Sequence, residues 1–255
     1  MKNEIILQAE NAGKNYNDSG RIVTAVDSVN LEVRKGDFVI IMGASGSGKS
    51  SLLFLLSCLE KCDSGSILFR DKRIDTARPA ELAGLRRKSF GFVFQGIHLV
   101  PYLSLRENVR IASLTAGNSV SKTDEMVAEL MENFCLGEAQ YGLPSRVSGG
   151  EAQRAAVARA VINKPEILFA DEPTGSLNHS AGSAILETFA QLNAEGQTIV
   201  LVTHELNAAC YGNRVIFMRD GKLHGELNMK EASLEKSSFE QRRMKLVSWL
   251  DERGW

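Results

Sequence analysis

The sequence predicts an α/β fold that combines a mostly parallel sheet, an N-terminal antiparallel β layer and an inserted α-helical subdomain. Apolar, strand-like runs alternate with helical patterns, and one of these runs leads directly into a glycine-rich loop. The spacing of apolar residues becomes helical from about 96 to 163. Strands interleaved with helices favour parallel pairing, because parallel neighbours need a crossover connection.

The strand-like runs have two patterns. Residues 29–33 alternate strictly, which predicts one solvated face, whereas residues 38–42 are continuously apolar, which predicts a strand covered on both faces. Asp220-Gly221 lies between two such runs and predicts a hairpin. The other expected strands are 5–9, 66–69, 90–94, 167–170, 198–203 and 215–218, and a helix is expected from the glycine-rich loop to about 59.

We expect residues 1–229 to form one domain, with the helical subdomain inserted, and residues 230–255 to form a C-terminal helical tail. The tail is charged and carries an apolar stripe at Phe239, Leu246 or Val247, and Leu250, which predicts an amphipathic helix. Packing on its own domain is the favoured interpretation, and lying on a membrane is the alternative.

Composition excludes several classes of protein. The chain has 255 residues and a formal net charge of −1, so it lacks the basic surface typical of nucleic-acid binding. The longest apolar run has about ten residues, where a membrane span needs roughly 20, and the N-terminus lacks a signal-peptide core. The four cysteines are expected to be buried, reduced thiols; a metal or redox pair lacks a second Cys/His pair of suitable spacing.

The glycine-rich loop fits the phosphate-loop pattern G-x-x-x-x-G-K-[ST]. Its residues are Gly43, Ala44, Ser45, Gly46, Ser47, Gly48, Lys49 and Ser50, and Ser51 follows as a further nucleotide-binding candidate. Glycines let the backbone wrap an anion, and the N–H groups at the start of the next helix carry partial positive charge. Lys49 adds a full charge at the β- and γ-phosphates, and the Ser50 hydroxyl is placed to bind Mg²⁺. The loop alone does not separate kinases, GTPases and transport ATPases.

Two carboxylates follow the apolar run of residues 167–170. The carboxyl end of a buried strand lies at the sheet edge where a phosphate loop also lies, so Asp171 is placed to hold Mg²⁺. Glu172 projects differently, towards an attacking water, as a general base. The alternative is a solvated turn.

A further stretch resembles the signature of the ABC-type ATPases. It comprises Val147, Ser148, Gly149, Gly150 and Glu151. In family order, Gln95 resembles the Q-loop glutamine, His204 the switch histidine, and Tyr16 the residue that stacks on adenine. Residues 176–178 occupy the D-loop. The resemblance covers residues 5 to about 225 and implies a P-loop NTPase core that binds ATP and Mg²⁺.

Each of these residues also has a plainer interpretation. Gln95 alone could be a surface amide, His204 a structural histidine, and Tyr16 a core or surface tyrosine. The resemblance implies that Gln95 contacts Mg²⁺ or water and that His204 contacts the γ-phosphate. His98, His179 and His224 have no motif support and are expected on the surface.

The signature has a physical meaning of its own, since Ser148 and the following glycines before a helix form a second anion site. One nucleotide needs only one phosphate loop, and family members sandwich two ATP molecules between two subunits. The resemblance therefore implies a dimer with a second copy of the chain. Two motifs depart from the family pattern. The signature has Val147 and Glu151, where leucine and glutamine are common, and the D-loop has Asn178, where aspartate is usual.

Several stretches resemble the branch of lipoprotein-release, macrolide-export and peptide-antibiotic (bacitracin-type) efflux ATPases; they cover residues 33–38, 91–95, 105–109 and 171–175. This implies an ATPase that powers export, or mechanical transmission, through a multi-spanning membrane permease, with the chain at the cytoplasmic face of the membrane. The alternatives are a regulatory role in cell division or cell-wall hydrolysis, a soluble ABC ATPase acting on ribosomes or DNA, and a P-loop kinase.

Overall fold

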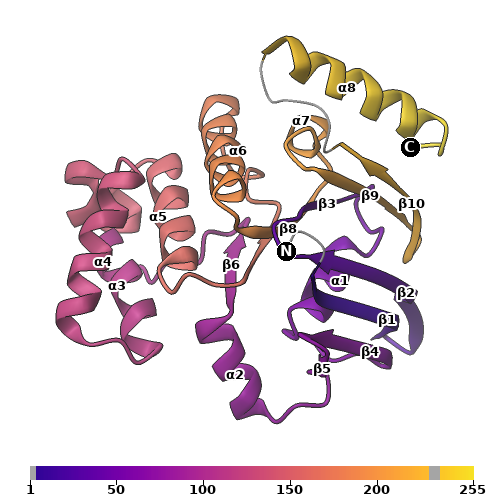
Figure 1. Cartoon of the computed structure of the whole chain (residues 1–255), viewed down its shortest axis with the longest axis horizontal. Coiled ribbons are helices and arrows are strands. Elements are labelled where there is room, and N and C mark those ends of the chain that lie inside the picture. The colour runs from indigo at the N-terminus through magenta and orange to yellow at the C-terminus, as the bar shows by residue number, and fades with distance from the viewer. Residues whose placement is uncertain (1–3, 230–235) are drawn as a thin grey trace. The chain divides into compact units, whose positions relative to one another are not determined.

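The computed structural model describes residues 4–229 and 236–255 (Figure 1). These residues divide into two units. Of the described residues, unit 1 comprises 4–78, 190–229 and 236–255, and unit 2 comprises 79–189. Each unit combines helices with strands, and the predicted α/β class is confirmed. The first six residues of the expected tail, 230–235, lie outside the described residues.

Unit 1 contains the predicted antiparallel layer. Its strands are β1 (Ile5–Asp18), β2 (Arg21–Arg34), β4 (Ser64–Phe69) and β5 (Lys72–Arg73), in the order β2-β1-β4-β5. β1 and β2 are longer than the apolar pattern indicates, because their adjoining ends are largely exposed. Pairing between the strands extends them through residues that bury no side chain.

A second set of strands in unit 1 carries the phosphate loop. β3 (Phe38–Met42) pairs in parallel with both β8 (Thr198–Thr203) and β9 (Arg214–Arg219), and β10 (Lys222–Asn228) forms the predicted hairpin with β9. Every residue of β3 and β8 is buried, which explains their continuous apolar pattern. The helices of this unit are α1 (Lys49–Leu56), α7 (Leu206–Ala209) and α8 (Lys236–Asp251).

Unit 2 contains most of the helical part. Its parallel strands are β6 (Phe90–Phe94) and β7 (Ile167–Asp171), and its helices are α2 (Pro79–Lys88), α3 (Leu105–Thr115), α4 (Val120–Asn133) and α5 (Gly149–Val161). Two 3-10 turns, Gly137–Tyr141 and Pro144–Arg146, precede α5, and α6 (His179–Ala194) begins in this unit. A Cβ on Gly91 would lie 2.5 Å from the Ala160 carbonyl oxygen. Glycine at this position therefore allows the C-terminal end of α5 to approach β6 closely. The expected limits of the helical subdomain, about 96 and 163, stay a prediction.

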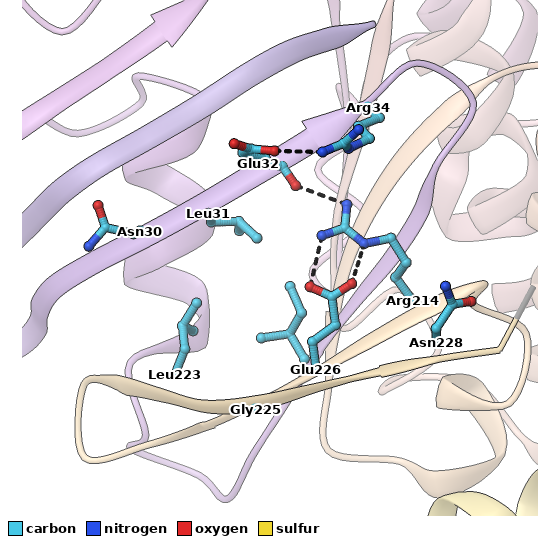
Figure 2. Close-up of a pocket in the computed structure, with 10 residues that line it drawn as sticks. Asn30, Leu31, Glu32, Arg34, Arg214, Leu223, Gly225, Glu226 and Asn228 are labelled. Atoms are coloured by element: carbon cyan, nitrogen blue, oxygen red, sulfur yellow. Dashed lines mark hydrogen bonds and ion pairs between the residues drawn. The ribbon is translucent and has the colours of Figure 1, made fainter. Parts of the chain in front are cut away.

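A buried arginine joins the two layers of strands within unit 1. Arg214 lies in a groove of about 610 Å³ between β2 and the β9-β10 hairpin (Figure 2). Its Nε and Nη2 donate to the carboxylate of Glu226 at 2.6 and 2.9 Å, and its Nη1 donates to the Glu32 carbonyl at 2.9 Å and to Asp37 at 2.5 Å. Burial alone would lower the pKa of Arg214, but the bonds to Glu226 and Asp37 raise it. Because each guanidinium nitrogen has an acceptor, we interpret the groove as a structural junction.

The described ranges contain no helix with the length and apolar character that crossing a bilayer requires. Cys58 and Cys210 are buried as expected, but Cys135 is exposed and Cys62 is half-buried, so the expectation is wrong for these two thiols. Cys135 lies in the turn after α4 and Cys62 in the segment between α1 and β4, and the apolar pattern of the neighbouring residues does not indicate this exposure. Burial raises the pKa of Cys62 and of Cys210 to about 11.

Candidate functional site

The phosphate loop connects β3 to α1 in unit 1. Gly48 is the N-cap of α1 with φ 99°, and no side chain caps this helix end. A Cβ on Gly48 would lie 2.0 Å from the Ala25 carbonyl oxygen, so glycine is needed for both space and conformation. Lys49 is 5% exposed, and its Nζ donates to the Ala44 carbonyl at 2.8 Å, which folds its side chain back over the loop.

The loop has the features expected of a phosphate site. Ser47 Oγ is buried and is one of the few buried side-chain atoms in the described chain without a hydrogen-bond partner. Gly46 has φ 79° and open space where a Cβ would lie. The first N–H groups of a helix have no partner inside the helix, so α1 adds donors and positive dipole charge here. The loop therefore fits a triphosphate.

His204 lies at the same edge of the parallel strands as the phosphate loop. Met42 pairs with Thr203 in the β3-β8 ladder, so the residues after them, Gly43 and His204, leave neighbouring strands at the same level. His204 is exposed, and the next residue is fixed by the Glu205 N–H, which donates to Thr203 Oγ1 at 3.0 Å. The other three histidines, His98, His179 and His224, are exposed as predicted.

Tyr16 lies on β1 and is half-buried. Its hydroxyl donates to Glu60 at 2.5 Å and contacts Ser51 Oγ at 3.4 Å, and the Lys14 Nζ lies 5.4 Å from its ring centroid. Burial, followed by the bond to Glu60, raises the pKa of Tyr16. The structure thus brings Tyr16 next to Ser51 in the first turn of α1, and its contact with adenine stays a prediction.

The two carboxylates lie at the end of β7 in unit 2. β7 ends at Asp171, and Glu172 has φ 43°, a left-handed conformation that residues with a side chain rarely adopt. The chain then turns, and the Gly175 N–H donates to the Glu172 carbonyl at 3.1 Å. Such a backbone conformation is often found at functional sites.

Gln95 is placed beside these carboxylates by the strand register. Phe94 pairs with Asp171, so Gln95 leaves β6 at the level where Glu172 leaves β7. Gln95 is exposed, and its carbonyl accepts a hydrogen bond from Ser176 Oγ at 3.2 Å. A Cβ on Gly175 would lie 2.7 Å from Gln95 Nε2. Unit 2 therefore brings together Gln95, both carboxylates and the D-loop.

The signature forms the N-terminus of α5. Ser148 is its N-cap and makes a capping box: Ser148 Oγ and N–H donate to the Glu151 carboxylate at 2.7 and 2.8 Å, and the Glu151 N–H donates to Ser148 Oγ at 3.3 Å. The bonds from Ser148 lower the pKa of Glu151. Glutamate at this position therefore completes a helix cap, while Ser148 and Gly149 stay exposed. The second departure is a cap too, because Asn178 Oδ1 accepts from the Ala181 N–H at 2.9 Å.

Two residues of this site were missed in the sequence. Gln153 on α5 is fully buried, and its Nε2 donates to the Pro173 carbonyl at 2.8 Å and, more weakly, to the Phe94 carbonyl at 3.5 Å. Arg159 donates to the carbonyls of Ile97 and His98 at 3.1 and 2.5 Å, and burial lowers its pKa. Both residues tie α5 to the backbone near Gln95 and Glu172. The only signal in the sequence was a polar residue inside an alanine-rich helix.

The candidate magnesium ligands are oxygen donors on separate segments. Ser50 belongs to unit 1, whereas Gln95 and Asp171 belong to unit 2. Among the residues with described positions, no cluster of three or more His, Cys, Asp or Glu side chains could hold a metal by itself. Each of the three candidate ligands is an oxygen donor of the kind that Mg²⁺ prefers in proteins, where it also takes ligands from water and substrate phosphates.

The family model described as "ABC transporter" matches residues 26–175. The ATP-binding protein YknY of Bacillus subtilis, an uncharacterised ABC transporter protein, is 38% identical over 86% of this chain and 95% of its own length. The macrolide export ATP-binding/permease protein MacB of Wolinella succinogenes is 36% identical over 97% of this chain. The chain spans only 39% of that MacB and 36% of the pyoverdine exporter PvdT of Pseudomonas fluorescens.

Solved structures give the same assignment. An ATP-binding cassette solved as a dimer in a post-hydrolysis state with ADP and Pi has a TM-score of 0.82 and 35% identity, covering 88% of this chain and 99% of that one. The matched segments contain the phosphate loop, the signature and both carboxylates. The chain therefore belongs to the ABC transporter family and is an ATPase of that family.

Proposed function

We propose that the chain is the ATP-binding and hydrolysing subunit of an export complex, acting as a dimer at the cytoplasmic face of a membrane. The observation that carries this proposal is that a single chain has two glycine-containing helix N-termini, at α1 and at α5, each of which suits a bound anion. One triphosphate occupies one phosphate loop, so the N-terminus of α5 is left for the nucleotide of a second copy.

In this proposal the phosphate loop binds the substrate ATP. Lys49 contacts the β- and γ-phosphate oxygens, the backbone of residues 43–51 surrounds them, and Tyr16 contacts the adenine. Ser50, Gln95 and Asp171 hold Mg²⁺, which supplies charge neutralisation at the phosphate oxygens. Ser148, Gly149, Gly150 and Glu151 of one copy contact the nucleotide held by the other.

Glu172 and His204 then act on the attacking water. Glu172, which follows Asp171 in a left-handed backbone conformation, accepts the proton of this water as the general base. His204 donates to the γ-phosphate and keeps the water in line. Little covalent chemistry is required of the protein, so positioning and electrostatic stabilisation by Lys49 supply most of the rate.

The proposed partner is a multi-spanning permease, since MacB and PvdT are named as ATP-binding/permease proteins. A groove of about 340 Å³ in unit 2 suits one of its cytoplasmic segments. Phe92, Phe94 and Arg159 line this groove together with Arg86 and Arg87, so an acidic segment with an apolar face would fit it. Arg159 also holds the backbone after Gln95, which gives a route from nucleotide state to partner.

The relatives named for macrolide export and pyoverdine export favour a small-molecule cargo. A peptide-antibiotic cargo of the bacitracin type stays a prediction from the sequence. We propose no nucleic-acid partner, because the formal net charge of −1 offers no basic surface.

Purification from detergent-solubilised membranes tests the function. The Glu172→Gln variant, loaded with ATP and Mg²⁺, should retain a multi-spanning membrane protein, because an ATPase that does not turn over stays in the coupled state. The Lys49→Ala variant is the matched control and should retain less of it. Recovery of ribosomes or DNA in place of a membrane protein would favour a non-transport ATPase.

A further inference from the structure

The tail helix α8 is anchored to unit 1 by a buried arginine. Arg242 is 3% exposed, and its Nε donates to the Cys210 carbonyl at 2.7 Å. Its Nη1 donates to the Met229 carbonyl at 2.9 Å and its Nη2 to the Gly212 carbonyl at 2.5 Å. All three of these hydrogen bonds end on backbone carbonyl oxygens. Burial lowers the pKa of Arg242.

Two of these acceptors lie just beyond the C-terminus of α7. This helix has four residues and begins at Leu206, two residues after His204. The last carbonyls of a helix have no partner inside it, and so short a helix is marginal without tertiary contacts. A cation at this end is favourable for the helix dipole as well. Arg242 therefore stabilises the turn that follows His204.

Hydrogen bonds hold the segment from His204 to Cys210, whose last carbonyl Arg242 contacts. The Glu205 N–H donates to Thr203 Oγ1, the Ala209 N–H donates to the Glu205 carbonyl at 3.1 Å, and the Cys210 N–H donates to the Leu206 carbonyl at 3.2 Å. With both ends of this segment fixed, the backbone of His204 has a defined position at the edge of β8.

We infer that Arg242 is a positioning residue for hydrolysis, which acts from the tail by holding α7 and through it His204. This inference rests on the proposed role of His204. It gives the tail a function in ATP turnover and makes α8 part of the catalytic unit.

The rest of α8 has anchors besides Arg242. Leu246 and Leu250 are fully buried, and Lys245 Nζ donates to the Asn228 carbonyl at the end of β10 at 3.3 Å. Replacing Arg242 should therefore leave the tail docked while it frees the end of α7. Lys245→Met is the matched control, because it removes a cation of the same helix that donates to a backbone carbonyl elsewhere.

The test is ATP turnover of the full chain in its dimeric, ATP-bound form. Arg242→Met should lower kcat about 10-fold or more and leave the Kd for ATP unchanged, since small displacements of a catalytic group cost rate rather than binding. Lys245→Met should keep the kcat of the parent. Equal kcat values for Arg242→Met and the parent would overturn the inference. If Arg242→Met does not fold, Arg242→Lys replaces it, because one ammonium cannot reproduce the planar fork of donors.

A double-variant cycle separates this inference from the proposed function. His204→Ala should itself lower kcat, and Arg242→Met should lower it no further when both are combined, because residues that act as a unit are not additive. If His204→Ala leaves kcat unchanged, the proposed role of His204 is wrong. If His204→Ala lowers kcat and Arg242→Met multiplies the loss, Arg242 does not act through His204 and the inference is wrong.

Discussion

We propose that the N-termini of α1 and α5 each bind a phosphate anion, but they differ in which groups satisfy them within one chain. The N-cap of α1 is Gly48, which offers no side-chain hydrogen bond, and a neighbouring hydroxyl, Ser47 Oγ, is buried without a partner. The N-cap of α5 is Ser148, whose hydroxyl and N–H both donate to Glu151.

This difference indicates an order of events. Under the proposed function, the α1 end, which is incomplete in a single chain, binds the triphosphate first. The α5 end already holds the Glu151 carboxylate, so Ser148 would exchange this partner for a phosphate oxygen of the nucleotide bound by a second copy. α3 provides an internal reference, because Ser104 and Glu107 form the same capping box at 2.7 Å without the two following glycines.

Glu172→Gln should have the largest effect. It should accumulate the state in which one nucleotide contacts the N-terminus of α1 in one copy and the N-terminus of α5 in the other, which sharpens the comparison. Loss of a general base lowers rates about 100- to 10,000-fold, so kcat should fall by that factor while ATP still binds. Size-exclusion chromatography with ATP and Mg²⁺ should show a stable dimer. Turnover at the rate of the parent would show that Glu172 is not the base.

Lys49→Ala tests the α1 end alone. A hydrogen bond between charged groups contributes about 1.5–3 kcal/mol, so the Kd for ATP should rise about 10- to 100-fold. Isothermal titration of the monomer measures it directly. An unchanged Kd would mean that the triphosphate binds elsewhere, and the comparison would fail at its first step.

Ser148→Ala tests the α5 end, with Ser104→Ala as its matched control. Loss of an N-cap costs about 1 kcal/mol in either helix, so both variants should melt at a lower temperature. Only Ser148→Ala should also weaken the ATP-dependent dimer, by about 10-fold, because one hydrogen bond to a charged oxygen is lost. Equal dimerisation of the two variants would assign Ser148 a purely structural role.

Glu151→Gln should have the smallest effect and shows how the α5 cap depends on pH. The pKa of Glu151 is lowered in the folded chain, so its stabilising contribution is complete above the unfolded value and is lost as pH falls through the lowered value. The side chain is exposed enough for solvent screening, so the melting temperature should fall only about 1 °C at neutral pH. This difference should disappear in acid.

The control for Glu151→Gln is Glu107→Gln, whose carboxylate is also held at a lowered pKa by Ser104. Its melting temperature should show the same direction of pH dependence. The two variants should differ in ATP-dependent dimerisation, which only Glu151→Gln changes. A dimer altered equally by both would contradict the assignment of α5 to the nucleotide.

The sequence predicted the parts of the fold that depend on local patterns. Strands β3, β6 and β8 match their predicted limits, because each is an apolar run bounded by polar or glycine residues. The long pairing of β1 with β2 was missed, because its distal residues are exposed and held by hydrogen bonds between strands. α1 ends at Leu56 and not near 59, since Cys58 adopts φ 50°.

The candidate site divides in the same way. The phosphate loop, both carboxylates and the signature are local patterns whose chemistry the residues themselves indicate. The roles of Gln153, Arg159 and Arg242 depend on carbonyl groups far away in the chain, which no local pattern reveals. The left-handed backbone of Glu172 is likewise a consequence of the turn that follows it.

The most direct test of the account is the structure of the Glu172→Gln protein with ATP and Mg²⁺. The account predicts a dimer in which each γ-phosphate lies within hydrogen-bond distance of Lys49 in one copy and of Ser148 in the other, with the bond between Ser148 Oγ and Glu151 broken. A triphosphate enclosed by a single chain, with the capping box of α5 intact and distant from any phosphate, would contradict it.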